Sequence, residues 1–235
     1  MVQKYASGNQ QDLLMNVTEA LTKRKSTRAF LDKPVETEKI KRILDAARHA
    51  PSGANTQPWQ VAVVTGHKKR QLEQRILEAH RSGIPPKMDY QYYPQEWPAK
   101  YKARRNATAV QLYTALGIGR DDRERRLEQW AANYRAFDAP MALFFFGDSI
   151  MQAGSFMDYG MFLQSIMLTA VEHGLATCPQ AALGEYPQIV KESLDYPADS
   201  ILLCGMALGY EDTEAAVNGY RTPREEVDSF TRFFD

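Results

Sequence analysis

The sequence predicts an α+β fold in which helices cover a single β-sheet. Strand-like and helix-like segments alternate along the chain, which is typical of helices packed around one sheet. The segments 140–148 ("PMALFFFGD") and 200–209 ("SILLCGMALG") are almost continuously apolar, as strands covered on both faces are. Segment 155–173 is apolar almost all the way round, so we expect a helix buried in the centre of the fold or in a subunit interface.

Length and composition narrow the class of protein. A chain of 235 residues suits one domain, 1–235, with room for an insertion. The 29 basic and 29 acidic residues balance, so the basic excess that favours a nucleic-acid partner is absent. No apolar run approaches the roughly 18 residues of a membrane span, and the N-terminus lacks a signal-peptide core. We therefore expect a soluble cytoplasmic protein with no membrane partner.

The cysteines and histidines do not suggest a metal site. Cys178 and Cys204 have neither a disulfide nor a zinc spacing, and both lie in apolar company, so we expect two small buried hydrophobes. The four histidines form no metal-binding pattern and no visible triad. No bound metal is expected.

The first third of the chain reads as two helices, a strand and a third helix. Residues 1–12 form a polar arm, and Asn16 can cap the first helix. Thr37 can cap the second, which places its apolar residues on one face. A Val-rich buried strand is expected over 59–65, followed by a helix over 67–81.

Residues 82–137 differ from the rest of the chain. They begin with a stretch dense in proline and aromatic residues and continue into two charged helices, roughly 99–116 and 121–135. This part is too polar for a core, so we interpret it as an excursion or lid. Its aromatic residues could form a wall of a substrate site; they are Tyr92, Tyr93, Trp97 and Tyr113.

The stretch "KRKSTRAF", 23–30, is the first candidate binding element. Arg24, Lys25 and Arg28 fall within five positions, with Ser26 among them. Guanidinium, ammonium and hydroxyl groups at this spacing can clamp a phosphate, although a solvated basic helix end has the same composition. No P-loop and no dinucleotide-binding glycine motif is present, so side chains would have to hold the phosphate.

The stretch "APSGANTQPW", 50–59, is the second candidate. A helix-to-strand loop, with Pro51 ending the helix and Gly53 at positive φ, would account for part of it. The amides of Asn55 and Gln57 each offer donors and an acceptor, which suits the edge of a flat heterocycle, and Ser52 could add a contact.

The stretch "TCPQAALGEY", 177–186, is the third candidate. If Pro179 follows the end of a strand, the amides of Gln180, Ala181 and Ala182 are free to stabilise developing negative charge. A simple strand-to-helix turn is the alternative.

The stretch "NGYRTPREEV", 218–227, is the fourth candidate, and it brings Arg221 and Arg224 close to the C-terminus. The alternative is a solvated charged tail. No nucleophile elbow accompanies these stretches, so in an enzyme the difficult chemistry would belong to a cofactor.

Taken in order, these stretches resemble the FMN-dependent nitroreductases. The similar residues are "RKSTRAF", "PSGANTQPW", "GMFLQSIMLTAVEHGLATCPQAAL" and "YRTPREEV", and the wording is most similar to the branch of nitrobenzoate and dinitroaniline reductases. The resemblance runs from about residue 16 to the end and is weakest over 82–137. It implies a three-layer helix/sheet/helix fold, an intertwined homodimer, and one FMN in each of two interfacial pockets.

The resemblance also implies roles for individual residues. Those implied to hold the FMN phosphate and ribityl chain are Arg24, Lys25, Ser26, Arg28 and Arg221. Those implied to bracket the isoalloxazine from the other subunit are Pro51, Ser52, Asn55 and Gln57. The turn implied to lie against the ring, with a backbone N–H near N5, is Pro179, Gln180, Ala181 and Ala182.

Two further points follow from the resemblance. The apolar helix 155–173 would form the dimer interface. Many members carry a lysine two positions before the last arginine, where this chain has Gly219, and Arg224 is the candidate to compensate.

The expected activity is a ping-pong oxidoreduction. NADH or NADPH would deliver hydride to the flavin, and a small electron-poor aromatic, a nitroarene or quinone, would then be reduced. The alternatives are a flavin-dependent reductive dehalogenase, a flavin-binding protein without turnover, and an interaction module without flavin.

Overall fold

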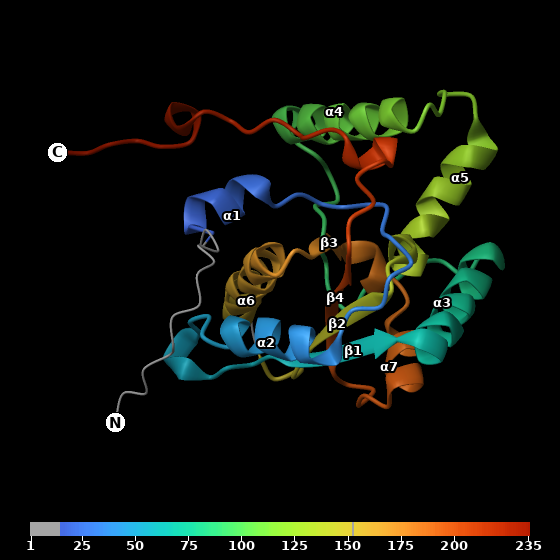
Figure 1. The fold of residues 1–235 in the computed structure, drawn as a ribbon, viewed down its shortest axis with the longest axis horizontal. Coiled ribbons are helices and arrows are strands. Elements are labelled where there is room, and N and C mark those ends of the chain that lie inside the picture. The colour runs from blue at the N-terminus through green and yellow to red at the C-terminus, as the bar shows by residue number, and fades with distance from the viewer. Residues whose placement is uncertain (1–14, 152) are drawn as a thin grey trace, which may run out of the picture.

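The structure is a computed structural model that describes residues 15–151 and 153–235, and it shows helices on both faces of one sheet (Figure 1). The polar arm predicted for residues 1–12 lies outside the described residues. The helices are α1 (Val17–Lys23), α2 (Thr37–Ala47), α3 (Gly66–Arg81), α4 (Ala99–Ala115), α5 (Arg123–Ala131), α6 (Ala153–Glu172) and α7 (Pro187–Leu194). The strands are β1 (Gln60–Thr65), β2 (Met141–Gly147), β3 (Ala176–Gln180) and β4 (Ile201–Gly209). Short helical turns are η1 (Gly53–Asn55), η2 (Ala132–Asp138), η3 (Ala181–Gly184), η4 (Ala216–Asn218) and η5 (Val227–Ser229).

The described strands form one antiparallel sheet in the order β1-β2-β4-β3. β2 and β4 are therefore central, and β1 and β3 lie at the edges. Between β2 and β4 the register shifts at Phe145/Phe146, where Phe145 faces Cys204 but Phe146 faces Leu202. This β-bulge leaves Leu203 without a partner in β2.

The apolar run of β2 is buried on both faces, as predicted, and its side chains alternate between two cores. Ala142, Phe144 and Phe146 pack with α3 and α7, whereas Leu143 and Phe145 pack with α2 and α6. The two cores confirm the predicted three-layer α+β arrangement.

Two predictions near the N-terminus are corrected. β1 is not a buried strand, because it has a neighbour on one side only, and Val63 is 41% exposed. Thr37 is not the cap of α2 but its first residue; Glu36 takes the cap position and makes no side-chain capping bond. Asn16 does cap α1, since its Oδ1 accepts a hydrogen bond from the Glu19 N–H at 2.9 Å.

The end of the predicted excursion belongs to the core. Tyr134, Ala136 and Phe137 are at most 5% exposed, although we expected a polar lid as far as residue 137. Ala136, Phe137 and Asp138 have left-handed φ angles of 51°, 54° and 58°, which turn the chain sharply into β2. α4 and α5 do form the expected charged pair of helices at the edge of the molecule (Figure 1).

α6 is buried on one side only in the single chain. Phe162 and Ile166 are at most 3% exposed, while Met157 is 71% and Met161 39% exposed. We predicted burial of this helix in the centre of the fold or in a subunit interface. The centre of the fold covers the side of Phe162 and Ile166 but not the side of Met157 and Met161. Cys178 and Cys204 are buried and free, as predicted. No helix in the described part of the chain is both long and apolar enough to cross a membrane.

Candidate active site

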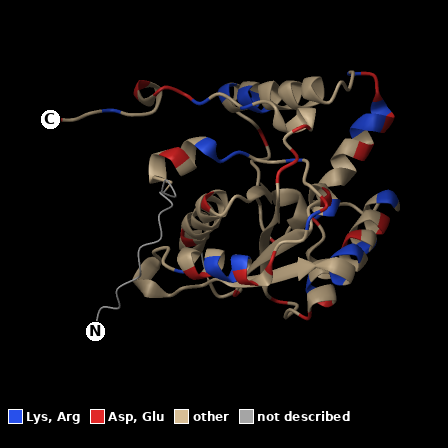
Figure 2. Ribbon diagram, in the orientation of Figure 1, with Lys and Arg blue, Asp and Glu red and all other residues tan. Residues whose placement is uncertain are grey.

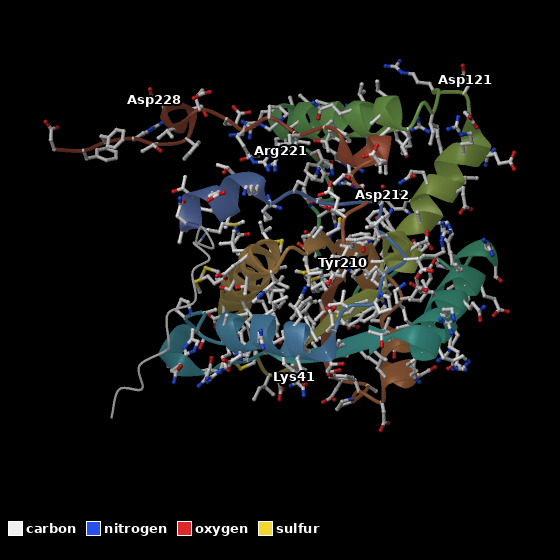
Figure 3. All side chains as sticks on the ribbon, viewed as in Figure 1. Lys41, Asp121, Tyr210, Asp212, Arg221 and Asp228 are labelled. Atoms are coloured by element: carbon white, nitrogen blue, oxygen red, sulfur yellow. The ribbon has the colours of Figure 1, made fainter. Side chains whose placement is uncertain are left out.

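Two segments from opposite ends of the chain lie side by side in the fold. The Leu31 N–H donates to the Tyr210 carbonyl at 2.9 Å, and the Asp212 N–H donates to the Ala29 carbonyl at 3.1 Å. This pairing brings the segment that follows α1 against the segment that follows β4, where Figure 3 labels Arg221 near the end of α1. The first and fourth candidate stretches of the sequence therefore meet.

Asn218 joins these two segments, and sequence reasoning missed it. Its side chain is 3% exposed. The Asn218 Oδ1 accepts from the Arg28 N–H at 2.8 Å, and Nδ2 donates to the carbonyls of Ala29 and Asp212, both at 2.9 Å. An asparagine before glycine is typical of an ordinary turn, so no local pattern indicates this buried role.

A cavity of about 580 Å³ opens between the two segments, α4 and α6. We call it the cationic cavity. It is lined by Leu21, Thr22, Arg24, Lys25, Ser26, Arg28, Thr108, Gln164, Tyr220, Arg221, Thr222 and Arg224. Every residue predicted to hold the phosphate lies here, together with Arg224 and with polar groups that we did not predict, such as Gln164 and Tyr220.

The arginines of this cavity carry charge that the protein itself does not neutralise. Among the described residues, none of Arg24, Arg28, Arg221 and Arg224 has a carboxylate within 4.0 Å. Burial, and then the charges of Arg224 and Arg221, lower the pKa of Arg24. Figure 2 shows Lys and Arg on many other elements, so the lack of acidic partners, not their number, distinguishes this cluster. An anionic ligand would relieve the repulsion.

The orientation of these side chains also favours a ligand. Arg221 donates to the carbonyl oxygen of Arg24 at 3.1 Å and to that of Lys23, which holds its guanidinium over the segment after α1. The Tyr220 hydroxyl is buried and has no hydrogen-bond partner within the described chain. A buried hydroxyl without a partner is costly unless a ligand or water satisfies it, so it fits a phosphate or a polyol.

Lys25 is arranged differently from the arginines. Its ammonium lies 2.6 Å from a carboxylate oxygen of Glu211 and donates to the Asn218 carbonyl, also at 2.6 Å. Since a carboxylate already balances this charge, Lys25 offers an anion less than its neighbours do. Its contact with the phosphate stays a prediction.

A second cavity, of about 470 Å³, is more apolar, and we call it the ring pocket. It is lined by Tyr90, Gln91, Tyr92, Phe156, Tyr159, Gly160, Leu163, Pro179, Gln180, Ala181, Leu203 and Cys204. Aromatic rings continue from it in a chain. The ring centroids of Tyr90 and Phe156 are 4.9 Å apart, those of Tyr90 and Tyr92 6.1 Å, and those of Tyr92 and Tyr93 4.5 Å. Such a pocket suits a flat aromatic molecule.

The turn on one side of the ring pocket corrects a prediction. Pro179 does not follow the end of the strand, because β3 continues through Pro179 to Gln180, which faces Gly205. An edge strand can accommodate a proline with its nitrogen turned away from the ladder. The Gln180 side chain is 4% exposed, and its Nε2 donates to the Asn133 carbonyl at 3.0 Å, so this amide faces the protein. The turn proper is η3, which begins at Ala181.

The loop 50–58 has a strained backbone. Ala54, Asn55 and Gln57 have φ angles of 49°, 56° and 47°, a left-handed region that costs a residue other than glycine roughly 1–2 kcal/mol. The positive φ that we expected at Gly53 is not observed, and the left-handed angles fall on these non-glycine residues instead. Strained backbone of this kind gathers at ligand sites, where the surrounding structure maintains it. Here the Gly53 N–H donates to Asp158 of α6, and the Gln57 N–H donates to the Ser52 hydroxyl at 2.9 Å.

The polar side chains of this loop do not reach either cavity of their own chain. Asn55 and Gln57 are exposed, and none of Pro51, Ser52, Asn55 and Gln57 lines the cationic cavity or the ring pocket. Trp59 holds the end of the loop, since it stacks on Phe162 of α6 with ring centroids 4.7 Å apart. This outward placement is what a contribution to a second copy of the chain requires.

The predicted substrate wall is brought together in part. Tyr92 lines the ring pocket, and Tyr93 and Trp97 continue its aromatic chain, with ring centroids 5.5 Å apart. Tyr113 lies elsewhere, in a cavity between α4 and α5, where the Arg126 guanidinium sits 4.1 Å above its ring. Tyr113 lies near the C-terminal end of α4, whereas the other three aromatics come before that helix. Their proximity in sequence within the excursion was therefore misleading. Among the described residues, no group of three His, Cys, Asp or Glu could hold a metal.

Known proteins are similar to this chain in sequence and fold. A family model described as the Nitroreductase family matches residues 21–210. A nitrobenzene nitroreductase of Ectopseudomonas oleovorans is 37% identical over 92% of this chain and 96% of that protein. A 4-nitrobenzoate reductase of Pseudomonas putida is 38% identical over 89% of this chain and 92% of that protein. The solved structure of the FMN-dependent nitroreductase NfnB from Mycobacterium smegmatis, in complex with NADPH, superposes with a TM-score of 0.90 at 33% identity, covering 95% of this chain and all of that one.

Proposed function

Because this chain belongs to the nitroreductase family, we propose that it binds FMN and uses NADPH or NADH to reduce nitroaromatic or quinone-type electron acceptors. The observation that carries the proposal is a cluster of unpaired arginines in one cavity and a flat aromatic pocket in another, on two parts of α6. Such a pair of sites suits a ligand with a phosphate at one end and a planar ring at the other.

Within this proposal the cationic cavity holds the phosphate and ribityl chain. Arg24, Arg28 and Arg221 supply guanidinium groups, and Ser26 supplies a hydroxyl. Arg224 replaces the charge that the family places where this chain has Gly219, a role supported by its position in the same cavity. Lys25 stays part of this proposed set.

The ring pocket and the strained loop hold the isoalloxazine, and the side of the pocket formed by Tyr90 and Tyr92 receives the acceptor. Pro179, Gln180, Ala181 and Ala182 lie against one side of it, and Pro51, Ser52, Asn55 and Gln57 reach it from a second copy of the chain. FMN, when bound, supplies the redox chemistry, taking two electrons from the nicotinamide and passing them to the acceptor. The protein's own residues hold the ring, orient the two substrates in turn and exclude water.

A homodimer is part of the proposal, since two apolar surfaces of the single chain lack cover. One is the side of α6 that carries Met157 and Met161. The other is the C-terminal tail, which extends from the body in Figure 1 and exposes Phe230, Phe233 and Phe234 by 71%, 83% and 89%. A second copy that covered both would place its own loop 50–58 near the cavities. Location in the cytoplasm is proposed with it.

A visible spectrum of the purified protein tests the proposal. We expect flavin absorbance bands, their loss when NADPH or NADH is added without oxygen, and their return on adding 4-nitrobenzoate. Recovery with 3-iodotyrosine in place of the nitroarene would favour the dehalogenase alternative. Reduction without recovery by either compound would favour a flavin-binding protein without turnover. A colourless protein that takes up no added FMN would refute the proposal.

A further inference from the structure

At the rim of the ring pocket, β4 is longer than its neighbour β3. β3 ends at Gln180, opposite Gly205, so the β4 residues 201–204 have no partner in β3. The bulge leaves Leu203 without a partner in β2 as well. Backbone groups of this stretch therefore need hydrogen-bond partners from outside the sheet, because unpaired buried backbone groups are costly.

The segment that enters the excursion supplies these partners. The Leu202 N–H donates to Asp89 Oδ2 at 2.8 Å, and the Tyr90 hydroxyl donates to the Leu203 carbonyl, also at 2.8 Å. Asp89 and Tyr90 thus take the place of a strand beside the end of β4 that β3 does not reach.

Asp89 is itself held by a buried ion pair. The Lys191 ammonium lies 2.9 Å from the same Asp89 Oδ2, and the Lys191 side chain is 3% exposed. Lys191 also donates to the Ala198 carbonyl at 3.1 Å, which fixes the ammonium to the chain that follows α7. A buried pair with these additional hydrogen bonds holds its partners in one geometry.

The bonds of Asp89 come directly before the aromatic chain in the sequence. In the described chain, no backbone–backbone hydrogen bond joins residues 91–97 to the rest of the protein. The positions of Tyr90 and Tyr92, which line the ring pocket, therefore depend on the anchor formed by Asp89.

We propose that Asp89, through its bonds to Lys191 and Leu202, is a positioning residue that holds Tyr90 and Tyr92 as the wall on which the aromatic electron acceptor packs. The inference rests on the proposed function. Asp89 does not touch the acceptor; it sets the shape of the pocket that receives it.

Two variants separate this role from a purely structural one. Asp89→Asn removes the ion pair but leaves Lys191 with an unpaired buried charge, which can unfold the protein. The double variant Asp89→Asn/Lys191→Met removes both charges and is the decisive one. The matched control is Glu192→Gln. Glu192 lies beside Lys191 on α7, and the substitution removes its exposed ion pair with Arg75 of α3.

Binding and half-reactions give the readout. We expect the dissociation constant of 4-nitrobenzoate from the oxidised protein, and its KM, to rise about tenfold or more in the double variant. FMN content, and the rate of flavin bleaching at saturating NADPH, should change less than about twofold, since the cationic cavity and the 179–182 side of the ring pocket are untouched. In flavin-free protein, trypsin should cleave the double variant after Lys87 faster than it cleaves the wild type, because the segment that follows Lys87 has lost its anchor.

Three results would overturn the inference. One is a folded double variant that binds 4-nitrobenzoate as the wild type does. Another is an equal loss of FMN and acceptor affinity, which would make the pair a support of the fold. The third is an equal effect of Glu192→Gln. A wild-type protein that binds no FMN would instead refute the proposed function, so the two failures are distinguishable.

Discussion

The cationic cavity and the ring pocket are built in opposite ways. The cationic cavity is made of long side chains; Arg221 and Arg224 are exposed, and their guanidinium groups are bonded mainly to carbonyl oxygens. The ring pocket is bounded by strand ends, a bulge and buried hydrogen bonds. Charge acts over several ångströms and tolerates movement, whereas a flat pocket depends on where its walls lie. Substitutions should therefore affect the two sites by different mechanisms.

The largest expected effect comes from steric crowding at Gly205 of β4, next to the ring pocket. In Gly205→Ala the new Cβ would lie 2.5 Å from Leu183 Cδ1 and 3.2 Å from the Leu143 carbonyl. Overpacking of this kind costs about 1–3 kcal/mol of unfolding free energy, measurable by urea denaturation. Leu183 belongs to η3, so acceptor binding should weaken too. Gly154→Ala, where a Cβ meets nothing within 4 Å, is the control; equal stability of the two variants would contradict the prediction.

The next effect concerns the cationic cavity. Arg221→Ala should raise the dissociation constant of FMN about tenfold to a hundredfold, since a hydrogen bond to a charged group contributes about 1.5–3 kcal/mol. Titration of flavin-free protein with FMN, followed by flavin fluorescence, measures it. Arg75→Ala makes the same charge change outside the cavity and should leave the affinity unchanged. If Arg221→Ala behaves like this control, the phosphate binds elsewhere.

A smaller effect concerns the strained loop 50–58, whose polar side chains line neither cavity of their own chain. Ala54→Gly should stabilise the protein by about 0.5–1 kcal/mol, because glycine adopts the left-handed φ of 49° without the steric cost that alanine bears. Thermal or urea unfolding measures the gain. Ala46→Gly, on the exposed side of α2, should instead destabilise by about 0.5–1 kcal/mol. Destabilisation by Ala54→Gly would show that the strain is not relieved by glycine.

The smallest effect on the two sites themselves belongs to a buried carboxyl outside both of them. Burial raises the pKa of Glu73 from its ordinary value of 4.5 to about 7, although Lys69 beside it acts in the opposite direction. The folded protein then keeps a proton that the unfolded chain releases, so stability falls as pH rises from 4.5 to 7, by at most about 3 kcal/mol. Glu73→Gln should remove this slope and leave FMN binding unchanged. Glu78→Gln, exposed on the same helix, is the control; a slope that survives Glu73→Gln would assign it to another group.

The sequence was sufficient where local pattern determines structure. The apolar runs of β2 and β4 led to one sheet covered by helices, because a strand without a polar side has to be buried. The residues predicted to hold the phosphate were chosen by their chemistry and line one cavity, although their meeting depends on Asn218, whose bonds span more than 180 residues of sequence.

The rest was beyond local pattern. The continuation of β3 through Pro179 depends on its pairing with β4, and the bulge at Leu203 depends on β2, so neither is visible in its own segment. The left-handed φ of Ala54 contradicts the preference of alanine and is imposed by the surrounding loop. Asp89 looks like any polar residue of an excursion until its partner Lys191 is known.

The position of Pro179 in an edge strand also bears on aggregation. Proline has no amide hydrogen, so β3 offers one donor fewer to an incoming strand from another molecule. Beside it, the Thr27 N–H already donates to the Thr177 carbonyl at 3.0 Å, which closes part of the same edge. This edge is therefore a poor template for the stacking of further chains into a continuous cross-β ribbon.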